Sequence, residues 1–121
     1  MKTMRIFLLF AAMTALPALA TTPDIEIQYL LDAVGDSSCT FNRNGKEHSA
    51  DEARDHLAMK YRRAGSRRIK TAESFIKYLA SESSWTGKPY SIECDGASVP
   101  SRDWLTDRLT TFRATSAEPG A

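Results

Sequence analysis

After residue 20, the sequence lacks any apolar run long enough to cross a membrane. Cysteine is scarce, since Cys39 and Cys94 are the two present in 121 residues. Their spacing relative to His48 and His56 matches no common zinc pattern. The sequence also lacks a G-x-S-x-G nucleophile elbow and a phosphate-binding loop. These absences argue against a zinc-finger protein, and against a hydrolase or a nucleotide-binding protein of the kinds that carry these motifs.

The first twenty residues have the composition of a secretory signal peptide. Lys2 and Arg5 form a short positive region, and residues 6–16 are apolar. Ala18-Leu19-Ala20 is a small-x-small site of the kind that signal peptidase cuts. We therefore expect a cleavable signal that delivers a mature chain beginning at Thr21 to a bacterial periplasm. An N-terminal membrane anchor that is never cut is the alternative.

The mature chain is expected to be nearly neutral. Removing Lys2 and Arg5 leaves 14 basic residues against 15 acidic ones, a net charge of −1. This balance argues against a nucleic-acid-binding protein, and we expect no stable membrane insertion after cleavage. About 100 residues form one small domain. We place this single globular domain at residues 21–113 and a flexible, polar tail at residues 114–121.

In an oxidising compartment, Cys39 and Cys94 are expected to form a disulfide. Each cysteine lies in a strand-like context, CTF and SIEC. Two alternatives are a metal site shared with His48 and His56 and a Cys–His nucleophile, although nothing in the sequence orients such a nucleophile. We expect the disulfide, no metal and no cofactor.

Four segments have the apolar spacing of amphipathic helices. They are residues 24–35, residues 50–63, a segment after Thr71 and a segment after Ser101. The most regular stripe, at i, i+3, i+4, i+7 and i+8, comprises Ala72, Phe75, Ile76, Leu79 and Ala80. Ser49 and Glu52 form a capping-box pattern at the start of the second helix.

Strand signals lie between the helices. Asn44-Gly45 is a strong hairpin-turn signal, which predicts a strand at residues 39–43 and a short return at residues 46–48. Residues 90–94 form a further predicted strand that pairs with residues 39–43. The sequence thus predicts an α+β fold, in which about four helices pack on a small two- to three-stranded antiparallel sheet with one disulfide.

The order of these motifs resembles that of one known family. The run FNRNGKEHSADEARDHLAMKYRR, followed by TAESFIKYLASESSWTGKPYSIEC and a Trp-bearing final helix, resembles the domain-of-unknown-function 5329 family. Its members are small exported proteins of Gram-negative bacteria. The resemblance covers about residues 25–112, and its distinctive pieces include Phe41, Arg43-Asn44-Gly45, Ala53, His56-Leu57, Lys60, Phe75-Ile76, Ser83-Ser84, Gly87, Pro89-Tyr90 and Cys94. It implies no activity, cofactor or catalytic residue.

The stretch KYRRAGSRRIK, residues 60–70, carries six positive charges and no negative one. Its first three cations end a predicted helix, where the helix dipole favours positive charge. Arg67, Arg68 and Lys70 instead precede a helix start, where the dipole disfavours cations. We call these three residues the basic ridge. Acidic residues elsewhere in the fold could neutralise it, and the candidates are Asp51, Asp55 and Glu73.

These observations favour a periplasmic binding or interaction module without catalytic residues of its own. Its expected partner is an acidic protein or an anionic envelope component, such as a phospholipid head group or lipopolysaccharide. Arg43, Trp85 and Tyr90 form a second candidate binding rim. The alternative function is a small envelope-modifying hydrolase with a cleft near Ser84 and His56. A hydrolase requires a concave pocket with a polar pair within hydrogen-bond reach, whereas a module is expected to show a ridge or flat face with unpaired basic residues.

The processing prediction can be checked by mass spectrometry of the protein purified from a periplasmic fraction. We expect a mature N-terminus at Thr21, because the small residues of Ala18-Leu19-Ala20 fit the peptidase. Detection of intact Met1 would support the uncleaved anchor instead, and any other N-terminus would correct the cleavage site.

Overall fold

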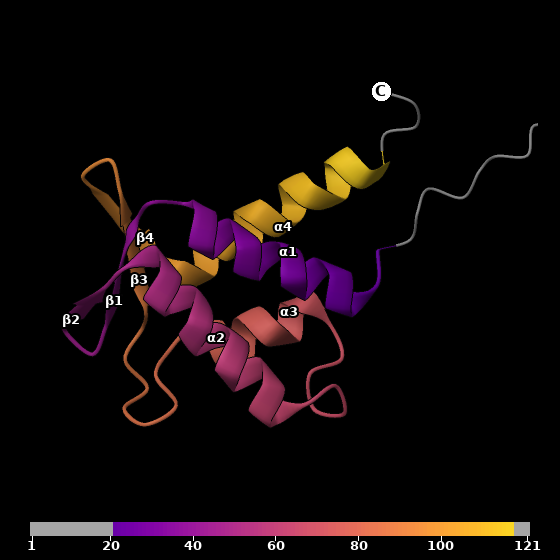
Figure 1. The fold of residues 1–121 in the computed structure, drawn as a ribbon, viewed down its shortest axis with the longest axis horizontal. Coiled ribbons are helices and arrows are strands. Elements are labelled where there is room, and N and C mark those ends of the chain that lie inside the picture. Colours follow the sequence, from indigo (N-terminus) through magenta and orange to yellow (C-terminus); the bar gives the residue numbers. More distant parts are fainter. Residues whose placement is uncertain (1–20, 118–121) are drawn as a thin grey trace, which may run out of the picture.

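The computed structural model describes residues 21–117 and shows an α+β fold (Figure 1). The sheet stands at one end of the helices in this view. In chain order the elements are α1 (Pro23–Asp36), β1 (Thr40–Arg43), β2 (Lys46–His48), α2 (Ala50–Ala64), α3 (Ala72–Phe75), the π-helical turn η1 (Ile76–Ala80), β3 (Ser91–Cys94), β4 (Ala97–Pro100) and α4 (Ser101–Ala117). The predicted signal peptide and the last four residues of the predicted tail lie outside the described residues.

The sheet is antiparallel, with the strand order β2-β1-β3-β4. The predicted turn at Asn44-Gly45 is confirmed, because both residues have positive φ, 53° and 77°, and they join β1 to β2. The predicted pairing of β1 with β3 is also confirmed, with Phe41 opposite Ile92. Both side chains are buried, so this register places Phe41 and Ile92 in the core.

The expected strand number was too low, since the sheet has four strands. β4 pairs with β3 through a tight turn at Asp95-Gly96. All four of its residues are exposed, so the strand shows no alternation of buried and exposed residues. Its pairing with β3 defines it instead, and Pro100 is tolerated there because an edge strand has a free side.

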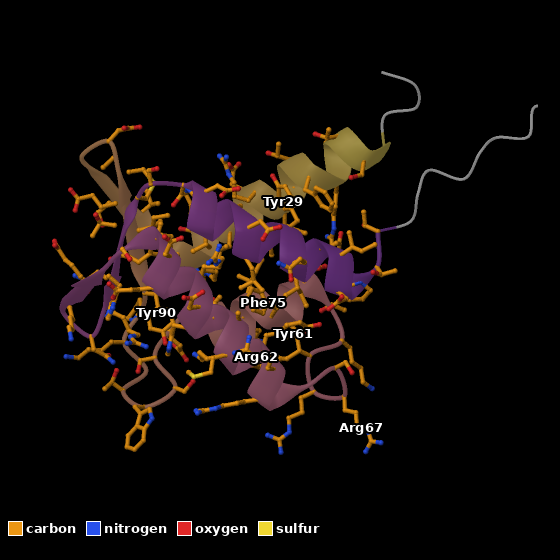
Figure 2. The ribbon with its side chains drawn as sticks, viewed as in Figure 1. Tyr29, Tyr61, Arg62, Arg67, Phe75 and Tyr90 are labelled. Atoms are coloured by element: carbon orange, nitrogen blue, oxygen red, sulfur yellow. A yellow bond between two sulfur atoms is a disulfide. The ribbon has the colours of Figure 1, made fainter. Side chains whose placement is uncertain are left out.

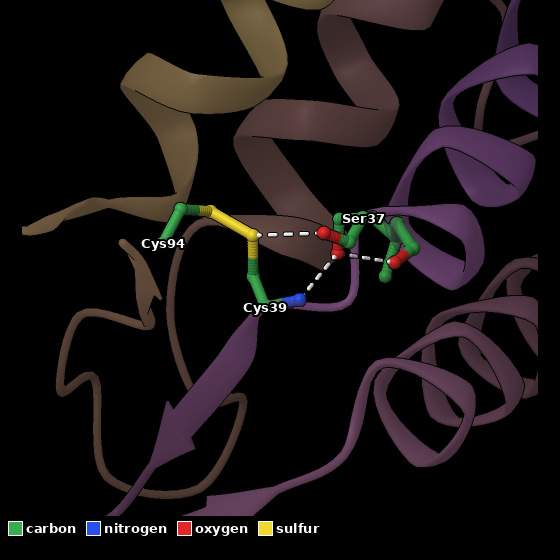
Figure 3. Close-up of a disulfide and its surroundings, with 4 residues drawn as sticks. Ser37, Cys39 and Cys94 are labelled. Atoms are coloured by element: carbon green, nitrogen blue, oxygen red, sulfur yellow. Dashed lines mark hydrogen bonds between the residues drawn. A yellow bond between two sulfur atoms is a disulfide. The ribbon is translucent and has the colours of Figure 1, made fainter. Parts of the chain in front are cut away.

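The predicted disulfide is confirmed. Cys39 and Cys94 are bridged, with their Cα atoms 4.8 Å apart and a sequence separation of 55. Closing a loop of that length stabilises a small domain by about 4 kcal/mol in the chain-entropy model. Figure 3 shows Ser37 beside the bridge: its hydroxyl donates to the Val34 carbonyl and accepts from the Cys39 amide. The end of α1 is thereby fixed next to the sheet.

The core is organised around α1. Its predicted apolar stripe is confirmed as buried and comprises Ile27, Leu30, Leu31 and Val34. These residues pack in one cluster with side chains of the other helices and the sheet, and α1 contacts α2, α3 and α4. Among residues 21–117, no helix is long and apolar enough to span a bilayer.

The third predicted helix is not uniformly α-helical. α3 makes one α-helical turn after the Thr71 cap, and the chain then continues as the wider π-helical turn η1. The Ser81 hydroxyl donates to the Ile76 carbonyl, five residues back, at 2.6 Å. The apolar stripe is kept, since Phe75, Ile76 and Ala80 are buried. Leu79 is only half-buried and lines the cleft described below.

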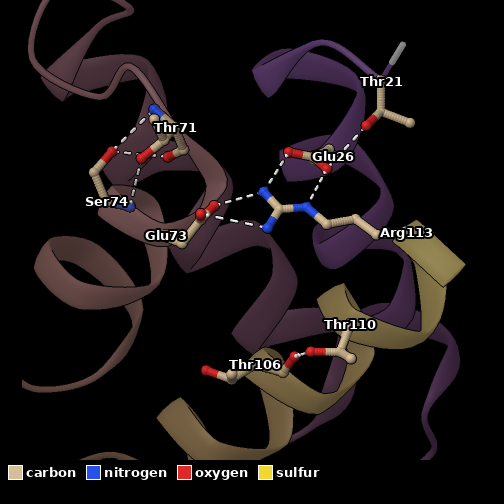
Figure 4. A network of polar contacts seen from close by, with 8 residues as sticks. All are labelled: Thr21, Glu26, Thr71, Glu73, Ser74, Thr106, Thr110 and Arg113. Atoms are coloured by element: carbon tan, nitrogen blue, oxygen red, sulfur yellow. Dashed lines mark hydrogen bonds and ion pairs between the residues drawn. The ribbon is translucent and has the colours of Figure 1, made fainter. Parts of the chain in front are cut away.

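An ion triad joins three helices on the side away from the sheet (Figure 4). The Arg113 guanidinium on α4 donates to Glu26 of α1 at 2.7 and 2.9 Å, and to Glu73 of α3 at 2.6 Å. Glu26 is 5% exposed, so its charge depends on this partner. α4 continues to Ala117, four residues beyond the boundary that we expected at Arg113.

Replacing Glu26 with Gln should lower the free energy of unfolding by about 1–3 kcal/mol, because it removes two charge-assisted hydrogen bonds from a buried position. Glu73→Gln is the matched control. Glu73 is well exposed, and its loss should cost no more than about 1 kcal/mol. Urea denaturation measures both values, and equal losses would contradict the assignment of Glu26 as the anchoring acid.

Candidate functional site

A cleft of about 640 Å³ opens between the β1–β2 hairpin, α2 and the loop that precedes β3. α2 contributes His56, Met59, Lys60 and Arg63. These residues follow the i, i+3, i+4, i+7 spacing that places side chains on one helical face. The hairpin contributes Arg43, Asn44, Lys46 and His48, and the opposite wall comprises Leu79, Ser83, Ser84, Trp85 and Tyr90.

The loop at one wall of the cleft is organised around Ser83. This serine is 5% exposed. Its hydroxyl oxygen accepts from the amides of Trp85 and Thr86 and from the Asn44 side chain, at 3.2–3.4 Å. Thr86 in turn donates to the Asn44 side-chain carbonyl at 2.6 Å. The loop is therefore fastened to the hairpin turn across the cleft.

Four side chains meet at the centre of the cleft. Arg43 Nη1 lies 2.7 Å from Nδ1 and 2.6 Å from Nε2 of His56, and a neutral imidazole accepts from it. Lys60 Nζ donates to the Tyr90 hydroxyl at 3.3 Å and lies 5.2 Å from the centre of its ring. Tyr90 is 7% exposed, and its burial raises the pKa of its hydroxyl.

This environment disfavours further positive charge. Burial, followed by the charges of Arg43, Lys60 and His48, lowers the pKa of His56 to about 4. Burial and the charge of Arg43 also lower the pKa of Lys60, although Glu82 acts in the opposite direction. At neutral pH, His56 is therefore uncharged, and the cations around it repel one another.

The charges that line the cleft have one sign. Its charged residues are Arg43, Lys46, Lys60 and Arg63, and no Asp or Glu is among the described residues that line it. His48 also lies at the cleft, but Glu52 pairs with it at 3.1 Å. Glu52 was expected to complete a capping box; Ser49 does accept from the Glu52 amide, but the Glu52 side chain turns to His48 instead. The cleft can thus accept an anion.

The residues that we predicted to bind a partner lie on two separate surfaces. It brings Arg43, Trp85 and Tyr90 together in the cleft. Arg67, Arg68 and Lys70 lie outside it, exposed in the segment between α2 and α3. Figure 2 shows Arg67 extending away from the ribbon, beyond the end of α2 that carries Arg62. The cleft and the basic ridge are therefore separate surfaces.

The two residues proposed for the hydrolase alternative, Ser84 and His56, both line the cleft. Within residues 21–117, no hydrogen bond joins them, and His56 is engaged by Arg43. Ser83, the neighbouring serine, uses its hydroxyl to hold the loop. The concave pocket expected of a hydrolase is present, but the expected pairing of Ser84 with His56 is not formed among the described residues. The exposed basic face expected of a binding module lies outside the cleft, at Arg67, Arg68 and Lys70.

Lys60 and Arg63 are cleft residues that the sequence interpretation missed. We assigned them to the end of a helix, where the dipole accounts for a cation. The signal that could have found them is their spacing from His56, since positions i, i+4 and i+7 share one helical face. Lys46 was missed because its place depends on the hairpin pairing, which sets it opposite Arg43.

Comparison with known proteins assigns the chain to a family. Residues 21–113 match a family model described as a family of unknown function, DUF5329. The chain belongs to the DUF5329 family. It is 42% identical over 84 residues to an uncharacterized protein of Salmonella typhimurium (strain LT2), YfeK, over 66% of this chain and 69% of that protein. No solved structure matches this DUF5329 chain. The resemblance noted in the sequence is therefore confirmed.

The charge state of His56 provides a test of the cleft geometry in this DUF5329 protein. Because the folded chain binds a proton at His56 less tightly than the unfolded chain, folding should lose stability as the pH falls from about 6.5 to about 4. Arg43→Gln should raise the pKa of His56, yet leave it below its usual range, because burial is the larger cause. NMR titration of the His56 ring protons measures this, with Arg62→Gln as the control. An unchanged pKa in Arg43→Gln would contradict the contact.

Proposed function

We propose that this protein is an exported, periplasmic binding module that holds the anionic group of its ligand in the cleft. The observation that carries the proposal is the cationic lining, with four Lys or Arg residues and no acidic residue among the described residues of the cleft. The anion would sit against Arg43, which contacts His56, and Lys60, which contacts Tyr90. Asn44 and the Ser84 hydroxyl, at the same cleft, add neutral hydrogen-bonding groups.

The electrostatics of the cleft support this proposal. Arg43 disfavours the charged forms of both His56 and Lys60. A bound anion would relieve that repulsion, because opposite charges at hydrogen-bond distance favour the protonated forms. Arg43 also provides a planar guanidinium, which suits the two oxygens of a carboxylate or phosphate group.

The export part of the proposal rests on different evidence. The disulfide between Cys39 and Cys94 is typical of a protein that folds in an oxidising compartment. The signal-like residues that precede Thr21 support the periplasm as that compartment.

The basic ridge remains part of the proposed binding surface. The acids that we expected to neutralise it are engaged elsewhere: Arg54 pairs with Asp51 and Asp55, and Arg113 pairs with Glu73. Among the described residues, none of Arg67, Arg68 and Lys70 forms an ion pair. These cations are consequently available to an anionic partner.

The cleft proposal is tested by NMR titration of the mature, disulfide-bonded protein with inorganic phosphate and with citrate at neutral pH. We expect saturable shifts at His56 and around Arg43 and Tyr90, and weaker binding as salt is added, because surface-accessible charges are screened. Arg43→Gln with Lys60→Gln should weaken binding about tenfold or more, since each charge-assisted hydrogen bond contributes roughly 1.5–3 kcal/mol.

The matched control is Arg62→Gln with Arg67→Gln, which removes the same net charge outside the cleft. We expect binding of both probes to change little in this control. Equal weakening in the two double variants would show a general charge effect, and the cleft would lose its assignment as the anion site.

A further inference from the structure

Trp85 is 97% exposed, and it is held at the tip of the loop that forms one wall of the cleft. An indole in so small a domain usually packs on the core, as the half-buried Trp104 does against Phe41. The loop instead directs the Trp85 indole into solvent. A contact with something outside the chain would account for this placement.

The backbone of this loop is largely satisfied by the loop itself. The Ser83 amide donates to the Lys88 carbonyl, and the Gly87 amide donates to the Ser83 carbonyl, both at 2.9 Å. The Trp85 and Thr86 amides donate to the Ser83 hydroxyl, and the Lys88 amide donates to Thr86. Few amide groups of the loop therefore depend on water. A contact at Trp85 would therefore require little rearrangement of these hydrogen bonds.

Cations lie on the same side of the molecule as Trp85. Arg63 and Trp85 line the same cleft, and Lys88 is an exposed residue of the Trp85 loop. Figure 1 shows that this loop and the segment after α2 both reach the lower edge of the molecule. We call this surface the docking edge; it comprises Arg62, Arg63, Arg67, Arg68, Lys70, Trp85 and Lys88.

One exposed acid, Glu82, lies at the base of the Trp85 loop, where it pairs with Pro89 as an isolated β-bridge. α1 carries four acidic residues and no basic one, and it lies on the side of α2 away from the docking edge (Figure 1). None of the five basic residues between Arg62 and Lys70 forms an ion pair with another described residue. The chain is nearly neutral as a whole, but the docking edge carries six cations against the neighbouring Glu82, so its net charge is complementary to an anionic surface.

We propose that the docking edge binds reversibly to the anionic phospholipid surface of a membrane, with the Trp85 indole in the interfacial region and the cations over the head groups. Indole rings favour the membrane–water interface, and clusters of Lys and Arg recognise anionic lipids. The proposal goes beyond the cleft, since the residues that hold the anion there, Arg43 and Lys60, are not part of the docking edge.

Shape favours a lipid surface over a folded protein partner. A side chain that projects as far as Trp85 can be buried by a protein only if that protein has a matching hollow. A bilayer needs no such hollow, because its interfacial region adapts to the indole. The cations are also spread along an edge rather than gathered around Trp85, which suits a surface with distributed charge.

The experiment uses the mature, disulfide-bonded protein in a Trp104→Phe background, so that fluorescence reports Trp85 alone. Vesicles of phosphatidylglycerol and phosphatidylethanolamine are compared with vesicles of phosphatidylcholine. We expect the anionic vesicles to shift the Trp85 emission to the blue at low salt, brominated lipid to quench it, and about 0.5 M salt to reverse binding. Phosphatidylcholine vesicles should bind weakly.

Two variants test whether the ridge cations and Trp85 contribute to vesicle binding. Arg67→Ala with Arg68→Ala should weaken vesicle binding at least about tenfold, because each cation near an anionic membrane contributes about fivefold. Trp85→Ala, followed by vesicle sedimentation, should also weaken it about tenfold through the lost apolar contact. The control Arg54→Gln with Arg102→Gln removes the same charge from ion pairs outside the docking edge and should bind nearly as the parent does.

The proposal is overturned if the anionic vesicles fail to bind at low salt, if phosphatidylcholine binds equally, or if the control loses as much as the ridge variant. A purified acidic protein that buries Trp85 when anionic vesicles do not would reassign the docking edge to a protein partner. The Arg43→Gln with Lys60→Gln protein retains the docking edge and should still bind these vesicles. A failure of the cleft proposal is thereby distinguished from a failure of this one.

Discussion

The antiparallel pairing of β1 with β3 is the constraint on which the rest of the structure depends. It joins segments that are about fifty residues apart in the chain, with Thr40 opposite Glu93 and Asn42 opposite Ser91. The disulfide closes one end of this strand pair, where Cys39 precedes β1 and Cys94 ends β3. At the other end, the same register brings Arg43 and Tyr90 to the cleft. One short ladder thus fixes both the covalent tie and the centre of the candidate site.

Buried charge is compensated by an opposite charge at the ion triad but not at the cleft. Glu26 is buried, but Arg113 compensates it directly and, as the largest cause, lowers the pKa of Glu26. At the cleft, Arg43 faces a neutral histidine and a lysine, and no lining carboxylate among the described residues compensates it. The first arrangement stabilises the packing of three helices. The second is unfavourable for the isolated chain and becomes favourable when an anion is present, which is how a binding site differs from a structural ion pair.

Much of the fold was predictable because its determinants are local. The buried stripe of α1 follows from Ile27, Leu30, Leu31 and Val34 at helical spacing, and the first hairpin follows from Asn44-Gly45. β4 was not predictable in this way, since Ala97–Pro100 buries no face and is defined by its partner strand. The π-helical turn η1 was also missed, because its apolar stripe reads as an ordinary α-helix.

The candidate site was only partly predictable, because it is assembled by tertiary contacts. Arg43, Trp85 and Tyr90 were identified from residue type and their place in turns and strand ends. Lys60 was assigned to the helix dipole, and its contact with Tyr90, thirty residues away, exists only after α2 packs beside the sheet. The exposure of the basic ridge, by contrast, was predictable from the sequence. Its segment is polar and contains glycine, so no knowledge of the fold was needed.

The fastening of the Trp85 loop by Ser83 has a consequence for the thermodynamics of association. Ordering a flexible loop normally consumes part of the free energy of binding as lost conformational entropy. Here the Ser83 hydroxyl and Asn44 hold the loop in place through contacts within the chain itself. Contacts at Trp85 therefore require little ordering of the backbone, and the favourable free energy of each contact is retained almost in full. A weak surface interaction is then fast and reversible, yet it still holds the partner in one defined orientation.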